Sequence, residues 1–389
     1  MPVVNRIAEL QPDVMAWRRD LHAHPELLYD VHRTAAFVAD RLREFGCDEV
    51  VTGLGRTGVV GVIKGKRSGG HLRGIGLRAD MDALPIHEET NLPYQSKTSG
   101  KMHACGHDGH TAMLLGAARY LAETRNFAGD VVVIFQPAEE GGFGAAAMMK
   151  DGLMERFAID QVYGMHNMPG IPVGQFAIRP GAMMASMDKL KIEIEGKGSH
   201  AAMPHMSIDP LLAGAQLVTA LQSVVARSVD PLESAVVSIC SFHAGHATNV
   251  IPQTAELLGT VRTLKLEVRD LVQRRVEAVV AGVAQTSGAR INLHYERGYP
   301  VLVNHAGQTD TALKIAADIA GPTNVAAETV PIMGAEDFAY MLEARPGAFI
   351  FMGNGDSAGL HHPSYNFNDD AIVYGTSYWA RLAETTLAA

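Results

Sequence analysis

The segment Val131-Val-Val-Ile-Phe-Gln136 continues into Pro137-Ala-Glu139-Glu140-Gly-Gly142, so a short apolar run ends in a turn that carries two acidic residues. Short apolar runs bounded by Gly, Pro or charged residues are typical of buried strands. Three further runs share this character, at residues 58–63, 72–80 and 162–166, and a helix is expected between two of the four, over residues 111–124. This alternation predicts an α/β fold, in which ligands bind beyond the carboxyl ends of the strands.

The regions on either side of this α/β segment differ in character. Residues 14–45 have apolar positions at helical spacing and end before Gly46, which predicts a helix pair or one broken helix. From Met187 the pattern changes to strand 189–196, helix 209–228, strands 234–244 and 255–264, helix 267–286 and strand 290–299. This order is ferredoxin-like. We therefore expect a domain of residues 187–298 inserted between two parts of one α/β domain, residues 1–186 and 299–389.

Composition excludes several classes of protein. A chain of 389 residues is long enough for two domains, and 47% hydrophobic with 19% charged residues is typical of a globular protein. No apolar run approaches the roughly 20 residues that cross a membrane. The formal charge of −9, without a basic cluster, argues against nucleic acid as a partner. The N-terminus lacks signal-peptide features and the three cysteines form no disulfide framework, so a cytoplasmic protein is expected.

Chemistry-bearing residues gather in the stretch His103-Ala-Cys105-Gly-His107-Asp108-Gly-His110. Thiolate, imidazole and carboxylate are the side chains that bind zinc-like divalent ions. Glu139-Glu140 after one strand, His166 at the end of another and His361 near the C-terminus add further ligand types. Taken singly, each is more often a solvated or hydrogen-bonded residue, so the spacing alone leaves a metal site and an ordinary surface both open.

Two neighbouring features can be interpreted from the residues alone. In the pair Glu139-Glu140, one carboxylate could bind metal while its neighbour moves a proton. The segment His22-Ala-His24-Pro-Glu26 also looks like a metal motif, but it lies in or beside an amphipathic helix. We interpret it as packing and capping, and leave it out of the site.

Together the motifs resemble the N-acyl-amino-acid amidohydrolases, which include the hippurate hydrolases and the plant hydrolases of auxin conjugates. The resemblance runs nearly end to end through Trp17-Arg-Arg-Asp-Leu-His-Ala-His-Pro-Glu26, Arg78-Ala-Asp-Met-Asp-Ala-Leu-Pro-Ile86, Met102-His-Ala-Cys-Gly-His-Asp-Gly-His110, Phe135-Gln-Pro-Ala-Glu-Glu-Gly141 and Leu360-His-His-Pro363. This group is a branch of the aminoacylase and carboxypeptidase superfamily of dinuclear metallohydrolases. The resemblance implies a catalytic α/β domain with a mixed, phosphorylase/hydrolase-like sheet, interrupted by a ferredoxin-like lid that usually also dimerises.

The resemblance also implies roles for individual residues. Two divalent ions per subunit (zinc, manganese, cobalt or nickel) would be held by Cys105, His107, Glu140, His166 and His361. Glu139 would be the general base. His200 resembles a lid histidine that reaches a neighbouring active site, and Asn249 and Arg262 resemble residues that contact the substrate carboxylate. Exopeptidases of the superfamily have His-x-Asp where this chain has Asp80-Met81-Asp82, so we expect Asp80 and Asp82 to support the ligands, with the Asp82 carboxylate accepting a histidine N–H.

The expected function is metal-dependent hydrolysis of the amide of a small N-acyl or N-aroyl amino acid by a homodimer, or by a higher oligomer, without nucleic acid or membrane partners. A dipeptidase or aminopeptidase of the same architecture is the alternative within the enzymes. A non-catalytic metal-dependent binding protein is the alternative outside them, but a base beside the ligands would then have no purpose.

Overall fold

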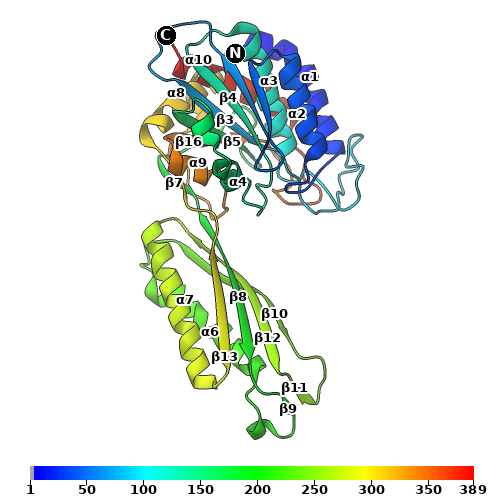
Figure 1. The fold of residues 1–389 in the computed structure, drawn as a ribbon, viewed down its shortest axis with the longest axis vertical. Coiled ribbons are helices and arrows are strands. Elements are labelled where there is room, and N and C mark those ends of the chain that lie inside the picture. The colour runs from blue at the N-terminus through cyan, green and yellow to red at the C-terminus, as the bar shows by residue number, and fades with distance from the viewer. Residues whose placement is uncertain (1–3) are drawn as a thin grey trace. The chain divides into compact units, whose positions relative to one another are not determined.

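The computed structural model describes residues 4–389 (Figure 1), so the first three residues of the N-terminal segment lie outside it. The chain forms two compact units. The first contains the chain up to Gly181, Val303–Val330 and Asp337–Ala389, and the second contains Ala182–Leu302 and Pro331–Glu336. The second unit is thus built mainly from one continuous segment in the middle of the chain.

The first unit is organised around a mixed sheet of eight strands in the order β1-β2-β4-β3-β5-β16-β6-β15. The strands are β1 (Glu49–Leu54), β2 (Gly58–Lys64), β3 (Gly74–Asp80), β4 (Asp130–Gln136), β5 (Gln161–Met168), β6 (Phe176–Ala177), β15 (Val325–Ala326) and β16 (Gly347–Gly353). The apolar runs predicted to be strands correspond to β2, β3, β4 and β5. All seven residues of β3 are buried, as expected of a central strand covered on both faces.

The central strands share one direction. β3 pairs in parallel with β4 and β5, and β5 pairs in parallel with β16. Their carboxyl ends therefore meet at one edge of the sheet, which we call the carboxyl edge. In open α/β sheets this is the edge at which ligands bind.

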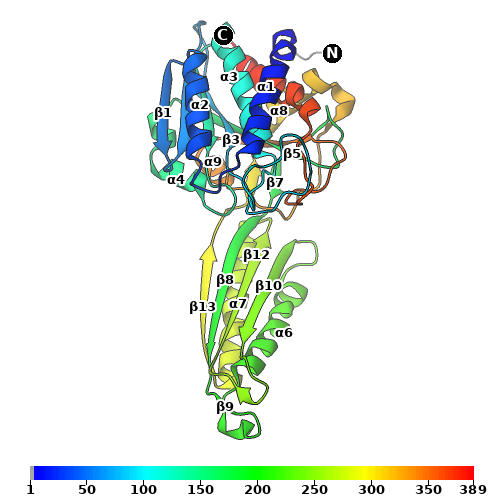
Figure 2. The ribbon, with the colours of Figure 1, turned by 90° about the vertical axis from the view of Figure 1, so that its right-hand side faces the viewer.

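Helices cover the sheet of the first unit. Their bounds are α1 (Asn5–Ala23), α2 (His32–Glu44), α3 (His107–Thr124), α4 (Gly144–Lys150), α5 (Leu153–Arg156), α8 (Ala306–Ala320), α9 (Ala339–Ala344) and α10 (Ile372–Thr386). α1 and α2 both contact α3, and the three lie side by side (Figure 2). α3 begins at His107 rather than at residue 111 as predicted, because Gly106 adopts a left-handed conformation (φ 91°) that turns the chain directly into the helix. None of the helices in residues 4–389 has both the length and the apolar character of a membrane span.

The predicted helix pair at the N-terminus is confirmed, and the segment between its members explains the break. α1 ends at Ala23, just before His24-Pro25, because the residue that precedes a proline is disfavoured in the helical conformation. The next residue, Glu26, accepts hydrogen bonds from the backbone N–H groups of Arg33 (3.0 Å) and Thr34 (2.8 Å) in the first turn of α2. A carboxylate at this position also interacts favourably with the helix dipole.

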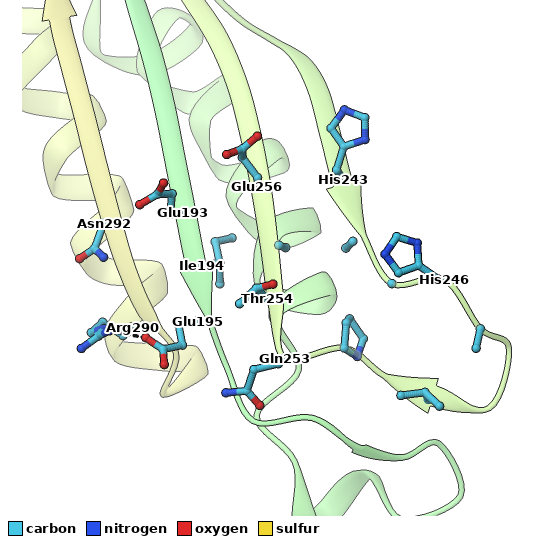
Figure 3. Close-up of a pocket in the computed structure, with 16 residues that line it drawn as sticks. Glu193, Ile194, Glu195, His243, His246, Gln253, Thr254, Glu256, Arg290 and Asn292 are labelled. Carbon is cyan, nitrogen blue, oxygen red and sulfur yellow. Dashed lines mark hydrogen bonds and ion pairs between the residues drawn. The ribbon is translucent and has the colours of Figure 1, made fainter.

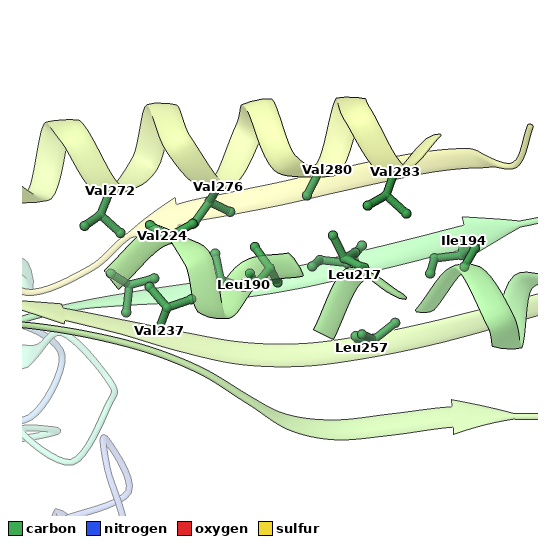
Figure 4. Close-up of a cluster of buried hydrophobic side chains, with 14 of the residues drawn as sticks. Leu190, Ile194, Leu217, Val224, Val237, Leu257, Val272, Val276, Val280 and Val283 are labelled. Atoms are coloured by element: carbon green, nitrogen blue, oxygen red, sulfur yellow. The ribbon is translucent and has the colours of Figure 1, made fainter. Parts of the chain in front are cut away.

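The second unit has the ferredoxin-like order that the sequence predicts. β8 (Ser186–Glu195), α6 (Pro210–Ser228), β10 (Ala235–Ala244), β12 (Thr254–Thr263), α7 (Leu266–Ser287) and β13 (Arg290–Arg297) follow one another, and the sheet order is β10-β12-β8-β13. One face of the sheet packs against both helices. Leu190, Ile192 and Ile194 alternate along β8 as buried residues and contact a core to which α6 and α7 contribute residues such as Leu217 and Val276 (Figure 4).

Shorter elements complete the two units. They are β7 (Gly181–Met184), β9 (Ser199–His200), β11 (Val250–Ile251), β14 (Leu302–Asn304) and the 3-10 turns Pro204–Met206, Pro322–Asn324 and Asp369–Ala371. β9 pairs with β11 in the second unit, with His200 opposite Val250.

Candidate metal centre

The residues expected to bind metal lie at the carboxyl edge of the first unit's sheet. His166 belongs to the end of β5, and Glu139 and Glu140 follow β4. Cys105 and His107 lie on either side of the Gly106 turn that opens α3. Most of this set is buried.

The five expected ligand residues converge on one small region. Cys105 Sγ lies 3.4 Å from His166 Nε2, and His107 Nε2 lies 3.9 Å from Glu140 Oε1. The same Glu140 oxygen lies 3.2 Å from Nε2 of His361. His361 is the exposed member, with 52% of its side chain accessible against 12% for Glu140. Residues from four separate segments thus bring nitrogen, sulfur and oxygen donors together.

The two buried histidines are oriented through their Nδ1 atoms. His107 Nδ1 lies 2.8 Å from the backbone oxygen of Asp82, and His166 Nδ1 lies 2.6 Å from that of Asn167. Because a carbonyl can only accept, each ring donates from Nδ1, so that in the neutral form of the ring Nε2 is the deprotonated atom and faces the site. Within the described residues 4–389, buried His107 Nε2 has no hydrogen-bond partner, although buried polar atoms almost always have one. A bound cation would satisfy this atom.

The charges of the site also fit a cation. Burial, together with the negative charge of Glu140 and Glu139, raises the pKa of the Cys105 thiol well above its usual value. Burial disfavours the charged form of His107, but Asp80, Asp82 and Glu140 outweigh burial and raise its pKa to about 10. Without a cation, Cys105 and His107 would thus hold their protons, although each side chain binds metal only after it has lost a proton. A divalent ion would supply the compensating positive charge instead.

Asp82 supports the site in a different way from the one expected. Its carboxylate lies 3.6 Å from His107 Nδ1, farther than its backbone oxygen does. The carboxylate instead accepts the backbone N–H groups of Glu139 (2.9 Å) and Glu140 (3.2 Å). Asp82 therefore fixes the turn that presents the two adjacent carboxylates.

That turn is tightly constrained on its other side as well. Ala138 has a positive φ of 54°, which is uncommon for a residue other than glycine. Gly144 cannot be replaced without a shift, because a Cβ there would lie 1.6 Å from the backbone oxygen of Pro137. One ligand atom each from His107, Glu139 and Glu140 lie within 4.8 Å of one another. A proton acceptor and a metal ligand can thus share this site.

Asp80 does not contact an expected metal ligand at hydrogen-bond distance. Its Oδ1 accepts a hydrogen bond from His110 Nδ1 (2.7 Å), its Oδ2 accepts one from Arg78 (2.8 Å), and its nearest approach to His107 Nε2 is 3.7 Å. The sequence analysis includes His110 in the motif but gives it no role, although the spacing of three residues from His107 on one helix was a signal that both face the same region.

The three residues expected to bind substrate lie in the second unit, but not together. His200 lies on β9, and the backbone oxygen of the nearby Asn249 accepts a hydrogen bond from Ala201 N (3.0 Å). Arg262 lies near the other end of β12, opposite Met187 of β8. At about 3.3 Å per residue, the strand separates Arg262 from the end near His200 by roughly 25 Å.

A hollow on the second unit lies near that same end of the sheet (Figure 3). Polar side chains on its wall include Glu193, Glu195, Glu256, His243 and His246. In the part of the chain that the structure describes, none of these residues belongs to a group of three close metal-ligand atoms. The hollow therefore has no metal-binding constellation comparable with that of the first unit.

A buried ionic cluster adjoins the metal centre and includes the histidine that we left out of the site. His22 lies between two carboxylates, with Nδ1 2.8 Å from Asp108 and Nε2 3.1 Å from Glu88. Arg18 also contacts Asp108, at 3.5 Å. Burial disfavours the imidazolium, but the hydrogen bonds to Asp108 and Glu88 outweigh burial and raise the pKa of His22 to about 9. Both ring nitrogens are therefore donors, and neither can bind metal.

The raised pKa of His22 predicts a pH-dependent contribution to stability. Because the folded-state value exceeds the ordinary 6.5, the contribution is complete below pH 6.5 and is lost as the pH rises through 9. We expect His22→Gln to lower the free energy of unfolding by roughly 3 kcal/mol more at pH 6 than at pH 10. Denaturant unfolding of both metal-stripped proteins at the two pH values checks this. An equal difference at both would contradict the charged pair.

Comparison with known proteins agrees with this geometry. The sequence model of peptidase family M20/M25/M40 matches residues 76–385 of the chain. A hippurate hydrolase of Campylobacter jejuni is 45% identical over 98% of this chain and 99% of its own, and an N-acetyl-L-cysteine deacetylase of Bacillus subtilis is 41% identical over 98% of this chain and 90% of its own. The crystal structure of the B. subtilis YxeP protein, described as a dinuclear metal-binding peptidase from the M20 family, superposes with a TM-score of 0.84. It is 36% identical and covers 98% of this chain and 99% of its own.

The family match spans most of the chain, and the relatives match it almost end to end. The buried nitrogen, sulfur and oxygen donors at the carboxyl edge suit the dinuclear site described for the YxeP protein. The chain therefore belongs to peptidase family M20/M25/M40.

Proposed function

We propose that the protein hydrolyses the amide bond of N-acyl or N-aroyl amino acids to a carboxylate and a free amino acid. As a member of its family and a relative of amide-cleaving enzymes, the chain is a metal-dependent amidohydrolase. The substrate class is our inference, because two similar proteins are named for hippurate and N-acetyl-L-cysteine, both N-acyl amino acids. The observation that carries the proposal is the convergence of five ligand-type side chains beside Glu139.

In this proposal Cys105, His107, Glu140, His166 and His361 hold two divalent ions. The ions would polarise the substrate carbonyl and lower the pKa of a bound water. The Asp82 carboxylate positions Glu139 and Glu140 through their backbone N–H groups, so the backbone that carries both residues is held in place. The mixed sulfur, nitrogen and oxygen set suits zinc, manganese, cobalt and nickel and does not select one of them.

Glu139 acts as the proton carrier. Its carboxylate accepts a proton from the attacking water, which forms the new C–O bond with the amide carbon. The same carboxyl then donates this proton to the amide nitrogen as the C–N bond breaks, so that the amine leaves in a neutral form. Burial of Glu139 limits competing solvent at this step.

Arg262 is proposed to bind the carboxylate of the amino-acid portion. It is half-buried, and burial lowers the pKa of Arg262. Among the described residues, its hydrogen bonds go to Thr260 and Val261 rather than to a carboxylate. A guanidinium without an acidic hydrogen-bond partner can form paired hydrogen bonds with a substrate carboxylate.

We propose a homodimer formed through the second unit, with His200 and Asn249 acting on the partner's site. The separation of about 25 Å along β12 exceeds the span of a small substrate, so one chain cannot apply all three residues to one molecule. A two-fold dimer resolves this, because each subunit can lend His200 and Asn249 to the other. His200 would then donate a hydrogen bond to the developing oxyanion.

The surface of the second unit supports such a dimer. β10 is an edge strand whose outer side pairs with no other strand in residues 4–389. Several apolar side chains are exposed on β10, on the start of α6 and on β12: Leu211, Leu212, Phe242 and Leu258. An unpaired edge with exposed apolar residues beside it is the kind of surface that a second copy covers.

Cytoplasmic location remains a prediction from the sequence.

A substrate panel tests the function. We expect protein stripped of metal to lose activity, and resupply of zinc, manganese or cobalt to restore amino-acid release from hippurate and N-acetyl amino acids. Unblocked dipeptides serve as the matched comparison, because they carry a free ammonium in place of the acyl group. Cleavage of dipeptides alone would move the protein to the peptidases, and tight metal binding without any cleavage would favour the binding-protein alternative.

A further inference from the structure

Asn167 is a fully buried polar residue at the end of β5 and lies next to the candidate ligand His166. Its Nδ2 donates a hydrogen bond to the backbone oxygen of Cys105 (2.7 Å). Its Oδ1 accepts one from the hydroxyl of Tyr365 (2.7 Å), which lies on the same loop as His361. One carboxamide thus connects three segments that carry candidate ligands.

The backbone of Asn167 makes two further contacts. Its oxygen accepts the hydrogen bond from His166 Nδ1 (2.6 Å), and its N–H donates to His110 Nε2 (3.0 Å). His110 in turn donates from Nδ1 to Asp80 (2.7 Å), so His110 is neutral and its Nε2 is occupied as an acceptor. His110 is therefore a support for β5 and not a metal ligand.

Steric fit at Gly106 shows how closely the carboxamide sits against the Cys105 turn. A Cβ added at Gly106 would lie 2.2 Å from Asn167 Nδ2 and 2.6 Å from the Tyr365 hydroxyl. The absence of a side chain at Gly106 lets the amide approach the peptide that joins Cys105 to α3. The same approach brings Cys105 Sγ within 3.4 Å of His166 Nε2.

We propose that Asn167 is a positioning residue whose carboxamide sets the Cys105–His166 ligand pair and ties it to the loop that bears His361. The proposal rests on the metal-ligand set of the proposed function. Only an amide satisfies all its partners, because Nδ2 must donate to Cys105 O while Oδ1 accepts from Tyr365. A carboxylate of the same shape would place an acceptor against the Cys105 oxygen.

The test uses full-length protein loaded with Co²⁺, whose thiolate-to-cobalt charge-transfer absorption reports ligation by Cys105. We expect Asn167→Asp and Asn167→Ala to bind cobalt about 10- to 100-fold more weakly in chelator competition, the range found for residues that orient metal ligands. The charge-transfer band should weaken in parallel. Thermal unfolding of the metal-stripped proteins measures the effect of each substitution on stability separately. If Asn167 had only a structural role, the substitutions would lower stability without changing the charge-transfer band or the cobalt affinity.

Tyr365→Phe keeps the test decisive if the Asn167 variants do not fold. It removes one hydroxyl, frees the Oδ1 end of the carboxamide, and should weaken cobalt binding several-fold, in line with one lost buried hydrogen bond. Wild-type cobalt affinity and an unchanged band in the folded variants would overturn the positioning role. A wild-type protein that binds cobalt without any thiolate band would instead overturn the ligand role of Cys105, and with it the present inference.

Discussion

Glu139→Gln is expected to reduce kcat about 10²- to 10⁴-fold, the usual contribution of a positioned general acid–base, while two metal ions stay bound. Glutamine has the same shape as glutamate but cannot accept and return a proton at neutral pH. The backbone N–H of Glu139 that bonds to Asp82 is untouched, so the turn should keep its geometry. Steady-state kinetics on hippurate, with metal content measured on the same sample, checks both parts.

The neighbouring residue supplies the matched control. Glu140→Gln changes the same functional group one position away, but Glu140 Oε1 is the atom that lies 3.2 Å from His361 and 3.9 Å from His107. That variant should lose metal together with activity. Near-normal turnover in Glu139→Gln would remove Glu139 as the base, and loss of metal from it would assign Glu139 to the ligands.

Much of the fold could be predicted from local pattern, because apolar periodicity depends on burial. The buried alternation of Leu190, Ile192 and Ile194 on β8 and the apolar run of β4 both reflect which faces are covered. The start of α3 could not be placed in this way. His107 and Asp108 carry no apolar signal, and the helix begins there because Gly106 can adopt a positive φ.

The candidate ligands could be named because their side chains have distinctive chemistry and their motifs resemble those of a known family, whereas the residues that hold them could not. His110, Asn167 and Tyr365 are buried polar residues whose roles depend on partners far away in the sequence. Asn167, for example, bonds to Cys105, 62 residues earlier, and to Tyr365, 198 residues later. A polar residue within an otherwise buried strand was the available signal, but it does not identify the partner. Nothing in the sequence indicates that His107 Nδ1 contacts the backbone oxygen of Asp82 rather than its carboxylate.

A hybrid dimer of one Glu139→Gln subunit and one His200→Ala subunit is expected to recover about half of the wild-type activity per dimer, although both parent homodimers are nearly inactive. The reason is the two-fold arrangement that we propose for the dimer. The subunit that keeps Glu139 receives His200 from its partner, so one of the two sites is complete. Co-expression with two different affinity tags and tandem purification isolates the hybrid for kinetic measurement.

Arg262 provides the control that distinguishes action across the dimer from general stabilisation by a partner. His200 and Arg262 lie at opposite ends of the second unit's sheet, and only His200 is assigned to the partner's site. A hybrid of Glu139→Gln with Arg262→Ala should therefore stay inactive, because the subunit that keeps Glu139, the proposed base, lacks Arg262, the residue proposed to bind the substrate carboxylate. Recovery in both hybrids would place Arg262 in the partner's site as well. Recovery in neither, or failure to isolate any hybrid, would show that each subunit works with its own His200. Because of the separation along β12, His200 would then have to contact a different part of the substrate from the one proposed.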